Sequence, residues 1–333
     1  MVTRNLVAVQ ARFSAAPYGS AASFRRYVYD LCERALSELP AGETLLAFPE
    51  IIGFPLVFSL ADPSRLSCAG QNDLARAVIR REWAQALSLM LRWRTFGLQA
   101  FFLLGAEAAY RAYTEAFAGA ARDFGVTIQA GSGFLPFAEN EPSKGLHFKS
   151  GRVYNLAHSF APTGRLLARH AKIHLTDGPE SLLNLSRGEL HQLTPVETPV
   201  GRLGVAVCLD GFYDSVLAHY DALACEIIVQ PSANFASWSR PWPSDPSLSE
   251  GDAWLTRGLS AGLTNRLHLR YGVNPMLVGE LWGLRAEGRS SIVASVPTEA
   301  GAFALSLHTG PDADEEGFVR YSVEDDSRLQ IEN

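Results

Sequence analysis

The chain has 333 residues, 47% apolar and 19% charged, which is typical of globular proteins that bury a large core. Its formal net charge of -6 and the lack of any Lys/Arg block argue against nucleic acid or an anionic membrane as a partner. The four cysteines form no C-x-x-C pair and no disulfide framework. The N-terminal apolar run is too short for a signal peptide, and no run approaches the roughly 20 residues of a membrane span, so we expect a cytoplasmic chain.

Strand and helix patterns alternate along the first half of the chain. Apolar runs with strand character cover residues 6–13, 44–48 and 126–132. Residues 98–104 fit a strand or part of a buried helix. Helical periodicity marks three segments: 23–38, with Phe24, Val28, Leu31 and Ala35 on one face; 72–94, with Ile79, Trp83, Leu87 and Met90 on one side; and a third with Tyr110, Tyr113, Phe117, Ala121 and Phe124.

The second half reads as two hairpins followed by further helices and strands. One hairpin covers 152–172 with its turn at Pro162-Thr163-Gly164, and the other turns at Gly201 and leads to Cys208. The remaining elements are a helix from Asp214 or Ser215 to about Cys225, a strand at 226–234, a loop at 239–249, a helix near 251–264, and strands near 271–274, 290–295 and 302–308. We therefore expect one α/β domain over residues 1–311. Residues 312–333 carry eight acids and are expected to form a solvated acidic C-terminal tail.

Cys208 stands where a run of small apolar residues meets the Asp210-Gly211 turn, in GRLGVAVCLDGFYD (201–214). A free cysteine in such a place often fills a core, because cysteine is among the most buried residue types. The turn and the capped helix behind it, however, place this strand end at the carboxyl edge of a sheet, where open α/β sheets bind ligands. Cys208 is therefore a candidate nucleophile, and it needs a base to remove its proton.

Two charged residues in apolar surroundings are candidates for the base and its partner. Glu50 follows a buried strand in LLAFPEIIGFP, and a buried carboxylate is costly unless it is paired or used. Lys172 follows the first hairpin in ARHAKIHL, between Ala171 and Ile173. Taken alone, Glu50 also fits an exposed loop acid, and Lys172 fits a surface lysine whose stem lies on apolar neighbours.

In this order and with these flanks, the three motifs resemble the nitrilase superfamily of carbon–nitrogen hydrolases. Lys172 stands 122 residues after Glu50, and Cys208 stands 36 residues after Lys172, as in the Glu-Lys-Cys triad of that family. The PTGRLL turn, VQPSANF and VNPMLVGELWGLRAEGRSSIVA match as well. The resemblance covers nearly the whole chain, from LVAVQARF to about Leu307.

The resemblance implies an α/β fold, a four-layer αββα sandwich, and a site with no cofactor or metal. Glu50 would be the general base, Cys208 the nucleophile that forms a thioester, and Lys172 with the backbone N–H of Leu209 the oxyanion hole. A second family glutamate stands eight positions after the lysine, where this chain has Glu180. Six more residues follow the motifs closely enough to line a substrate pocket, and each also fits a core or interface position: Phe54, Phe212, Tyr213, Asn234, Phe235 and Trp238.

The implied reaction is the hydrolysis of a small amide to a carboxylic acid and ammonia or an amine. Hydrolysis of a nitrile or an N-carbamoyl substrate would use the same triad, and acyl transfer and a non-catalytic scaffold role also stay open. Leu209-Asp210-Gly211 after the cysteine looks more like aliphatic amidases than like true nitrilases, which usually have Trp-Glu there. The segment of residues 56–106 is long for the family, and we expect it either to cover the site or to alter the assembly. We expect the protein to form a homodimer or a larger homo-oligomer.

A metal hydrolase is the last alternative. His170 and His174 lie four residues apart, with Asp177 beyond them. On a strand the two histidines would share a face, but no third strong ligand motif follows.

Overall fold

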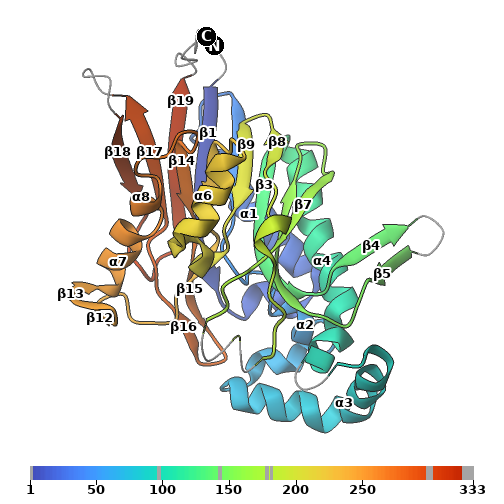
Figure 1. Ribbon diagram of the computed structural model, residues 1–333. Helices are drawn as coiled ribbons and strands as arrows, with labels where there is room; N and C mark the ends of the chain where they lie inside the picture. Colours follow the sequence, from blue (N-terminus) through green and yellow to red (C-terminus); the bar gives the residue numbers. More distant parts are fainter. Residues whose placement is uncertain are drawn as a thin grey trace.

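Two β-sheets lie face to face, and helices cover both outer sides (Figure 1). The structure is a computed structural model that describes residues 3–95, 99–141, 145–176, 180, 183–297 and 303–324. Its layers run helix, sheet, sheet, helix, which confirms the predicted αββα sandwich. None of the helices in these ranges is both long enough and apolar enough to cross a bilayer.

The larger sheet has nine strands within the described ranges. They are β1 (Thr3–Phe13), β2 (Glu43–Ala47), β3 (Thr127–Leu135), β6 (Tyr154–Phe160), β7 (Leu166–Ala171), β11 (Ser232–Ala233), β15 (Met276–Leu281), β16 (Leu284–Ala286) and β19 (Gly317–Glu324). Their order is β11-β15-β1-β2-β3-β6-β7, with β16 beside β15 and β19 beside β1. The sheet is mixed, because β1, β2 and β3 are parallel whereas β6 and β7 form the predicted antiparallel hairpin.

The smaller sheet has the order β18-β17-β14-β10-β9-β8. Its strands are β8 (Val196–Thr198), β9 (Gly201–Val205), β10 (Ile227–Val229), β14 (Tyr271–Asn274), β17 (Ser291–Pro297) and β18 (Phe303–Thr309). The predicted hairpin at Gly201 is confirmed as β8–β9. Two separate hairpins are β4 (Ala138–Glu141) with β5 (Gly145–Phe148) and β12 (Pro241–Trp242) with β13 (Asp245–Ser249).

The helices divide between the two outer sides. The helices are α1 (Ala21–Leu36), α2 (Leu56–Ser59), α3 (Gln71–Trp93), α4 (Gln99–Phe124), α6 (Asp214–Ala222), α7 (Glu250–Arg257) and α8 (Leu259–Gly262). α1 and α4 pack on the larger sheet, while α6 and α8 pack on the smaller one. Residues 99–104 open α4, so the helical reading of that ambiguous segment is correct.

Strand alternation explains how one strand serves two cores. In β1, Val7 and Val9 face the core under α1 and α4. Leu6 and Ala8, on the opposite face, lie in the core between the sheets with residues of β9, β10 and β14. Because successive side chains of a strand point to opposite faces, both sides of the sheet bury apolar groups.

The apolar stripe predicted on the helix 72–94 lies mostly on its exposed side. Ile79, Trp83 and Leu87 are exposed, Trp83 by 61%. α3 buries a different set: Leu74, Val78 and Ala86. The helix therefore carries apolar residues on two sides, and the fold buries the side with Leu74 and Val78.

The segment expected as a solvated tail contributes a strand to the larger sheet. β19 pairs antiparallel with β1 along its whole length. Val319 of this strand is buried between the two sheets. The tail prediction is therefore wrong for residues 317–324, and residues 325–333 lie outside the described residues.

Candidate active site

Glu50 lies just beyond the carboxyl end of β2, where the chain leaves the sheet. The backbone of Phe48 still donates to Gln129, but Ile51 has φ 54° and its N–H donates to the Ser132 hydroxyl at 2.9 Å. A Cβ on Gly131 would lie 2.0 Å from the Pro49 carbonyl oxygen, so this close passage requires glycine. The turn buries the Glu50 side chain, of which 3% is exposed.

Lys172 follows β7, and its ammonium is held between two carboxylates. Its backbone N–H donates to Asn155, and its own carbonyl accepts from Gly188. The Nζ atom lies 2.8 Å from Oε1 of Glu50 and 2.9 Å from Oε2 of Glu180. With 1% exposed, Lys172 is buried and doubly paired, and the surface reading of this lysine is excluded.

Cys208 is the first residue of a short 3-10 helix, Cys208–Phe212, and not the last residue of a strand. β9 ends at Val205, although Cys208 N–H still donates to the Pro231 carbonyl at 2.8 Å. The cysteine has φ 51°, a left-handed conformation that is uncommon outside glycine and that often marks functional sites. Its Sγ lies 4.0 Å from the carbonyl oxygen of Ala233.

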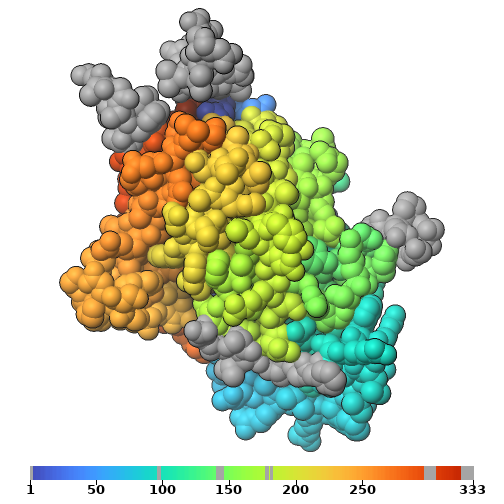
Figure 2. All heavy atoms as spheres, in the orientation of Figure 1, coloured from blue at the N-terminus to red at the C-terminus, as the bar shows by residue number. Residues whose placement is uncertain are grey.

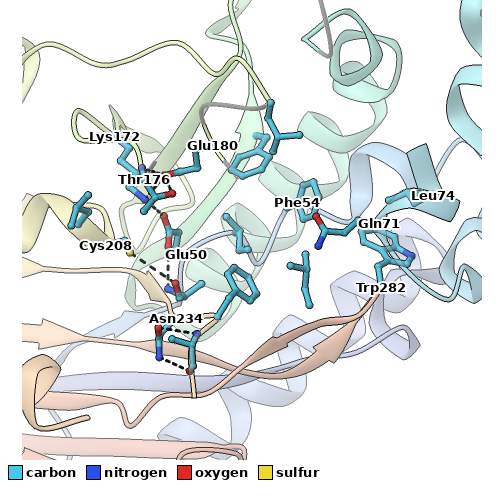
Figure 3. A pocket seen from close by; sticks show the side chains of 18 of the residues that line it. Glu50, Phe54, Gln71, Leu74, Lys172, Thr176, Glu180, Cys208, Asn234 and Trp282 are labelled. Atoms are coloured by element: carbon cyan, nitrogen blue, oxygen red, sulfur yellow. Dashed lines mark hydrogen bonds and ion pairs between the residues drawn. The ribbon is translucent and has the colours of Figure 1, made fainter. Parts of the chain in front are cut away.

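Glu180, which the family resemblance singled out, lies beside Lys172 and lines the same cavity as the other three residues. Besides Lys172, its carboxylate accepts from the backbone N–H of Thr176 at 2.8 Å and from the Thr176 hydroxyl at 3.0 Å. All four candidate catalytic residues thus lie together, and Leu209 lines the same cavity. Figure 3 shows Cys208, Lys172, Thr176, Glu180 and Glu50 grouped on one side of that cavity.

Asn155 of β6 belongs to this group and was not predicted from the sequence. Its amide Nδ2 donates to Glu50 at 2.8 Å and to Glu180 at 2.9 Å. Asn155 is fully buried, but its strand also carries the buried polar residues His158 and Ser159, so the sequence of this strand does not distinguish it. We call Glu50, Asn155, Lys172, Glu180 and Cys208 the polar cluster.

Asp210 ties the lysine loop to the cysteine turn. Its buried carboxylate accepts from the backbone N–H groups of Ile173, at 3.0 Å, and His174, at 2.8 Å. The ring Nδ1 of His174 lies 2.8 Å from the same carboxylate. The sequence indicated only a turn residue here, whereas the structure uses Asp210 to fix the segments that carry Lys172 and Cys208.

Burial and charge set the protonation states in the polar cluster. Burial raises the pKa of Glu50 above the usual 4.5, although the Lys172 ammonium opposes the rise. Burial also raises the pKa of the Cys208 thiol well above its usual value, and the charge of Glu50 raises it further. Burial acts to lower the pKa of Lys172, but the surrounding negative groups outweigh it and the net pKa is well above the usual value. The thiol is therefore protonated at neutral pH, and its reaction requires a base.

A cavity of about 590 Å³ opens onto the polar cluster. Four of the six predicted pocket residues line it: Phe54, Phe212, Asn234 and Phe235. The other two are not in its lining. Tyr213 is exposed and stacks on the His174 ring, and Trp238 packs its indole over Gly251.

The metal alternative finds no support in the described part of the chain. His170 Nε2 lies 3.0 Å from the Thr194 carbonyl oxygen, whereas His174 faces Asp210. No group of three His, Cys, Asp or Glu side chains within the described ranges could hold a metal ion. Asp177, the third candidate ligand, lies outside these ranges.

Comparisons with known proteins match the chain to carbon–nitrogen hydrolases. The model of the carbon–nitrogen hydrolase family matches residues 26–251. Among curated proteins, omega-amidase NIT2 of Xenopus tropicalis is 34% identical over 91 residues, 25% of this chain and 32% of the relative. Hydrolase C26A3.11 of Schizosaccharomyces pombe is 34% identical over 92 residues, 26% of this chain and 28% of the relative. The matched part thus spans about a third of the length of these relatives.

Solved structures share the fold over nearly the whole chain. A carbon–nitrogen hydrolase from Helicobacter pylori G27 superposes with a TM-score of 0.58 at 19% identity, covering 96% of this chain and 88% of that one. An amidase variant from Nesterenkonia sp. AN1, whose active-site cysteine carries the acetamide moiety of fluoroacetamide, gives 0.55 at 18% identity, with 99% and 93% covered. At these identities the likeness shows the fold.

Proposed function

The chain belongs to the carbon–nitrogen hydrolase family, and from this premise we propose that it hydrolyses an amide to a carboxylic acid and ammonia or an amine, with Cys208 as the nucleophile. The observation that carries the proposal is the polar cluster. A thiol, a carboxylate and an ammonium are buried together at one end of a cavity. Buried ionisable groups are costly unless they are paired or used, and those with perturbed pKa values concentrate at functional sites.

The first half of the proposed reaction transfers the acyl group to the cysteine. Glu50 accepts the proton of the Cys208 thiol, and the sulfur electron pair forms a bond to the amide carbonyl carbon. The carbonyl π electrons move to its oxygen, and Lys172 with the N–H of Leu209 stabilises that oxyanion. The oxyanion then collapses and the C–N bond breaks. Glu50 gives its proton to the leaving nitrogen, and a thioester remains on Cys208.

The second half releases the acid. Glu50 accepts a proton from a water molecule, whose oxygen forms a bond to the thioester carbon. The C–S bond breaks, and the thiolate recovers the proton from Glu50. The same carboxylate therefore acts as base and acid in both halves, which fits its raised pKa.

Glu180 and Asn155 have positioning roles in this proposal. Glu180 holds the Lys172 ammonium, and Asn155 bridges Glu180 to Glu50. Asn155 donates to both carboxylates through one nitrogen, so it keeps two like charges at a fixed separation. Neither residue transfers a proton in the scheme above.

Ammonia release from a panel of primary amides, nitriles and N-carbamoyl amino acids tests the proposal. Wild type should release ammonia from amides, and Cys208→Ala should not, while its thermal melting curve stays that of wild type. Release from nitriles or N-carbamoyl amino acids alone would redirect the assignment to those substrates. Equal release by the folded Cys208→Ala protein would refute the nucleophile. Transfer of the acyl group to added hydroxylamine, with little free acid formed, would favour an acyltransferase.

A further inference from the structure

We propose that the substrate amide carries an uncharged apolar chain or ring, which lies in the part of the cavity walled by residues 54–78, Phe102 and Trp282. This inference rests on the proposed amide hydrolysis and adds the class of substrate. The apolar wall, as we call this surface, consists of Phe54, Phe58, Leu74, Val78, Phe102 and Trp282.

The apolar wall lies on the other side of the cavity from the polar cluster. Figure 3 shows Phe54, Leu74 and Trp282 away from Cys208 and Lys172. The aromatic rings of the wall contact one another: Phe54 lies 5.8 Å from Phe58 and 5.8 Å from Trp282, between ring centroids. The cavity therefore offers a reacting end and a separate apolar end.

The size of the cavity exceeds what a two-carbon acyl group needs. Cavities of about 300–1,000 Å³ accommodate drug-sized ligands, and this one holds about 590 Å³. Each methylene group that becomes buried raises binding affinity about fourfold. An amide whose chain reaches the apolar wall should therefore bind more tightly than acetamide.

The charges along the cavity do not favour an acidic substrate. Among the described lining residues outside the polar cluster, the charged side chains are Arg240 and Glu250, which pair at 3.0 Å. The Asn234 amide nitrogen donates to the carbonyls of Ala236 and Glu287. A substrate carboxylate at the apolar wall would lose its water and meet no buried cation there, which is costly.

Hydrogen bonds and an ion pair behind the apolar wall hold its residues in place, so the fold itself fixes the shape of the wall. Arg65, 3% exposed, pairs with Glu82 of α3 and donates to the Phe58 carbonyl. The Trp282 indole donates to the Arg65 carbonyl at 2.8 Å. Figure 2 shows the α3 segment forming the lower end of the molecule. Leu74 and Val78 are buried residues of this helix. Described residues of the long 56–106 segment, among them Phe58, Leu74 and Phe102, thus line the site.

Calorimetric binding to Cys208→Ala tests the inference without turnover. The probes are acetamide, butanamide, hexanamide and adipamate, the last matching hexanamide in length with a terminal carboxylate. N-pentylacetamide places the same pentyl chain on the nitrogen. Hexanamide or N-pentylacetamide should bind at least about tenfold more tightly than acetamide, and the tighter of the two shows which side of the amide faces the wall. Adipamate should bind at least about tenfold more weakly than hexanamide.

Three further variants, each made with Cys208→Ala, locate the effect on the wall. Leu74→Asp should weaken binding of the preferred long amide about tenfold. Leu91→Asp, on the same helix and 76% exposed, is the matched control and should leave binding unchanged. Val78→Thr nearly keeps the side-chain shape and should weaken the long amide in the same direction if Leu74→Asp does not fold.

The outcomes separate this inference from the proposed function. Binding that does not tighten with chain length, or adipamate binding as well as hexanamide, overturns the apolar-substrate inference even if wild type hydrolyses amides. Tight, chain-dependent binding supports this inference even if wild type releases neither ammonia from the primary amides nor an amine from the N-alkylacetamide. That absence of turnover would refute the proposed function instead. Cys208→Ser repeats the series if Cys208→Ala fails to fold.

Discussion

The two ends of the cavity are built on opposite principles. At the polar cluster, Lys172 holds Glu50 and Glu180 within 2.9 Å, and Asn155 bridges the same carboxylates. At the apolar wall, rings and aliphatic chains meet by packing, and an ion pair, Arg65 with Glu82, lies behind the surface. The polar cluster is thus held by hydrogen bonds and ion pairs among its own members, whereas the members of the wall contact one another by apolar packing.

This difference predicts different tolerance to change. Removing one member of a buried ionic network leaves another charge without its partner, so the cost is large and local. Apolar surfaces accept substitutions of similar volume at modest cost. Changes at the polar cluster should therefore stop the chemistry, whereas changes at the wall should alter which amide is bound.

Among the residues that surround Cys208, Glu50 should have the largest effect on kcat/KM when it is changed to Gln. Glutamine keeps the shape but cannot accept the thiol proton. We expect kcat/KM for amide hydrolysis to fall about 10³-fold or more. Steady-state kinetics beside a thermal melt checks this, and a folded variant with near wild-type rates would remove Glu50 from the mechanism.

Lys172→Met should lower kcat by about 10²–10³-fold, because it removes an oxyanion donor. Met keeps much of the stem length, so lost packing contributes little. The variant also leaves Glu50 and Glu180 facing each other without a cation, and unfolding should become easier by about 3 kcal/mol. Denaturant unfolding and kinetics together check both effects. Unchanged kcat with reduced stability would make this lysine structural only.

The pH profile should show one acid limb from Glu50. The base must be deprotonated, so kcat/KM should fall as the pH drops through the raised pKa of Glu50, above 4.5. The charge of Glu180 contributes to that rise. Glu180→Gln removes it, so the limb should move to lower pH. A limb that stays in place or moves to higher pH would contradict the assignment.

Of these variants, Arg65→Met should have the smallest effect on the rate of amide hydrolysis, but it should weaken the apolar wall. It leaves Glu82 partly buried without its partner, and the free energy of unfolding should fall by about 3 kcal/mol. The preference for hexanamide over acetamide should shrink while the acetamide rate changes little. Trp83→Ala, on the exposed face of α3, is the matched control and should change stability by less than about 0.5 kcal/mol. If Arg65→Met and Trp83→Ala changed stability and substrate preference equally, Arg65 would have no special role in holding the apolar wall.

The polar end of the cavity was the part most open to prediction from sequence. Glu50, Lys172 and Cys208 each follow a strand in a local motif, and the carboxyl edges of strands meet in such folds. Asn155 could not be assigned in the same way, since its role depends on two carboxylates distant in sequence. A polar residue in a strand reveals its partners only when the sheets are assembled.

The apolar end was harder to predict for a related reason. α3 has apolar residues on two sides, and periodicity groups Ile79 and Trp83 on one of them without showing which side is buried. Only the packing of α3 in the assembled fold, where it contacts α4, buries Leu74 and Val78. In the same way, the acids of residues 312–333 masked the alternating strand β19, whose partner β1 lies at the opposite end of the sequence.

The most direct test of the central claim is the intact mass of wild-type protein acid-quenched during turnover of a saturating primary amide, followed by peptide mapping. The account predicts an added mass of one acyl group, carried by the peptide that contains Cys208 and absent from Cys208→Ala. An acyl group mapped to any other residue, or amide turnover by Cys208→Ala, would contradict it.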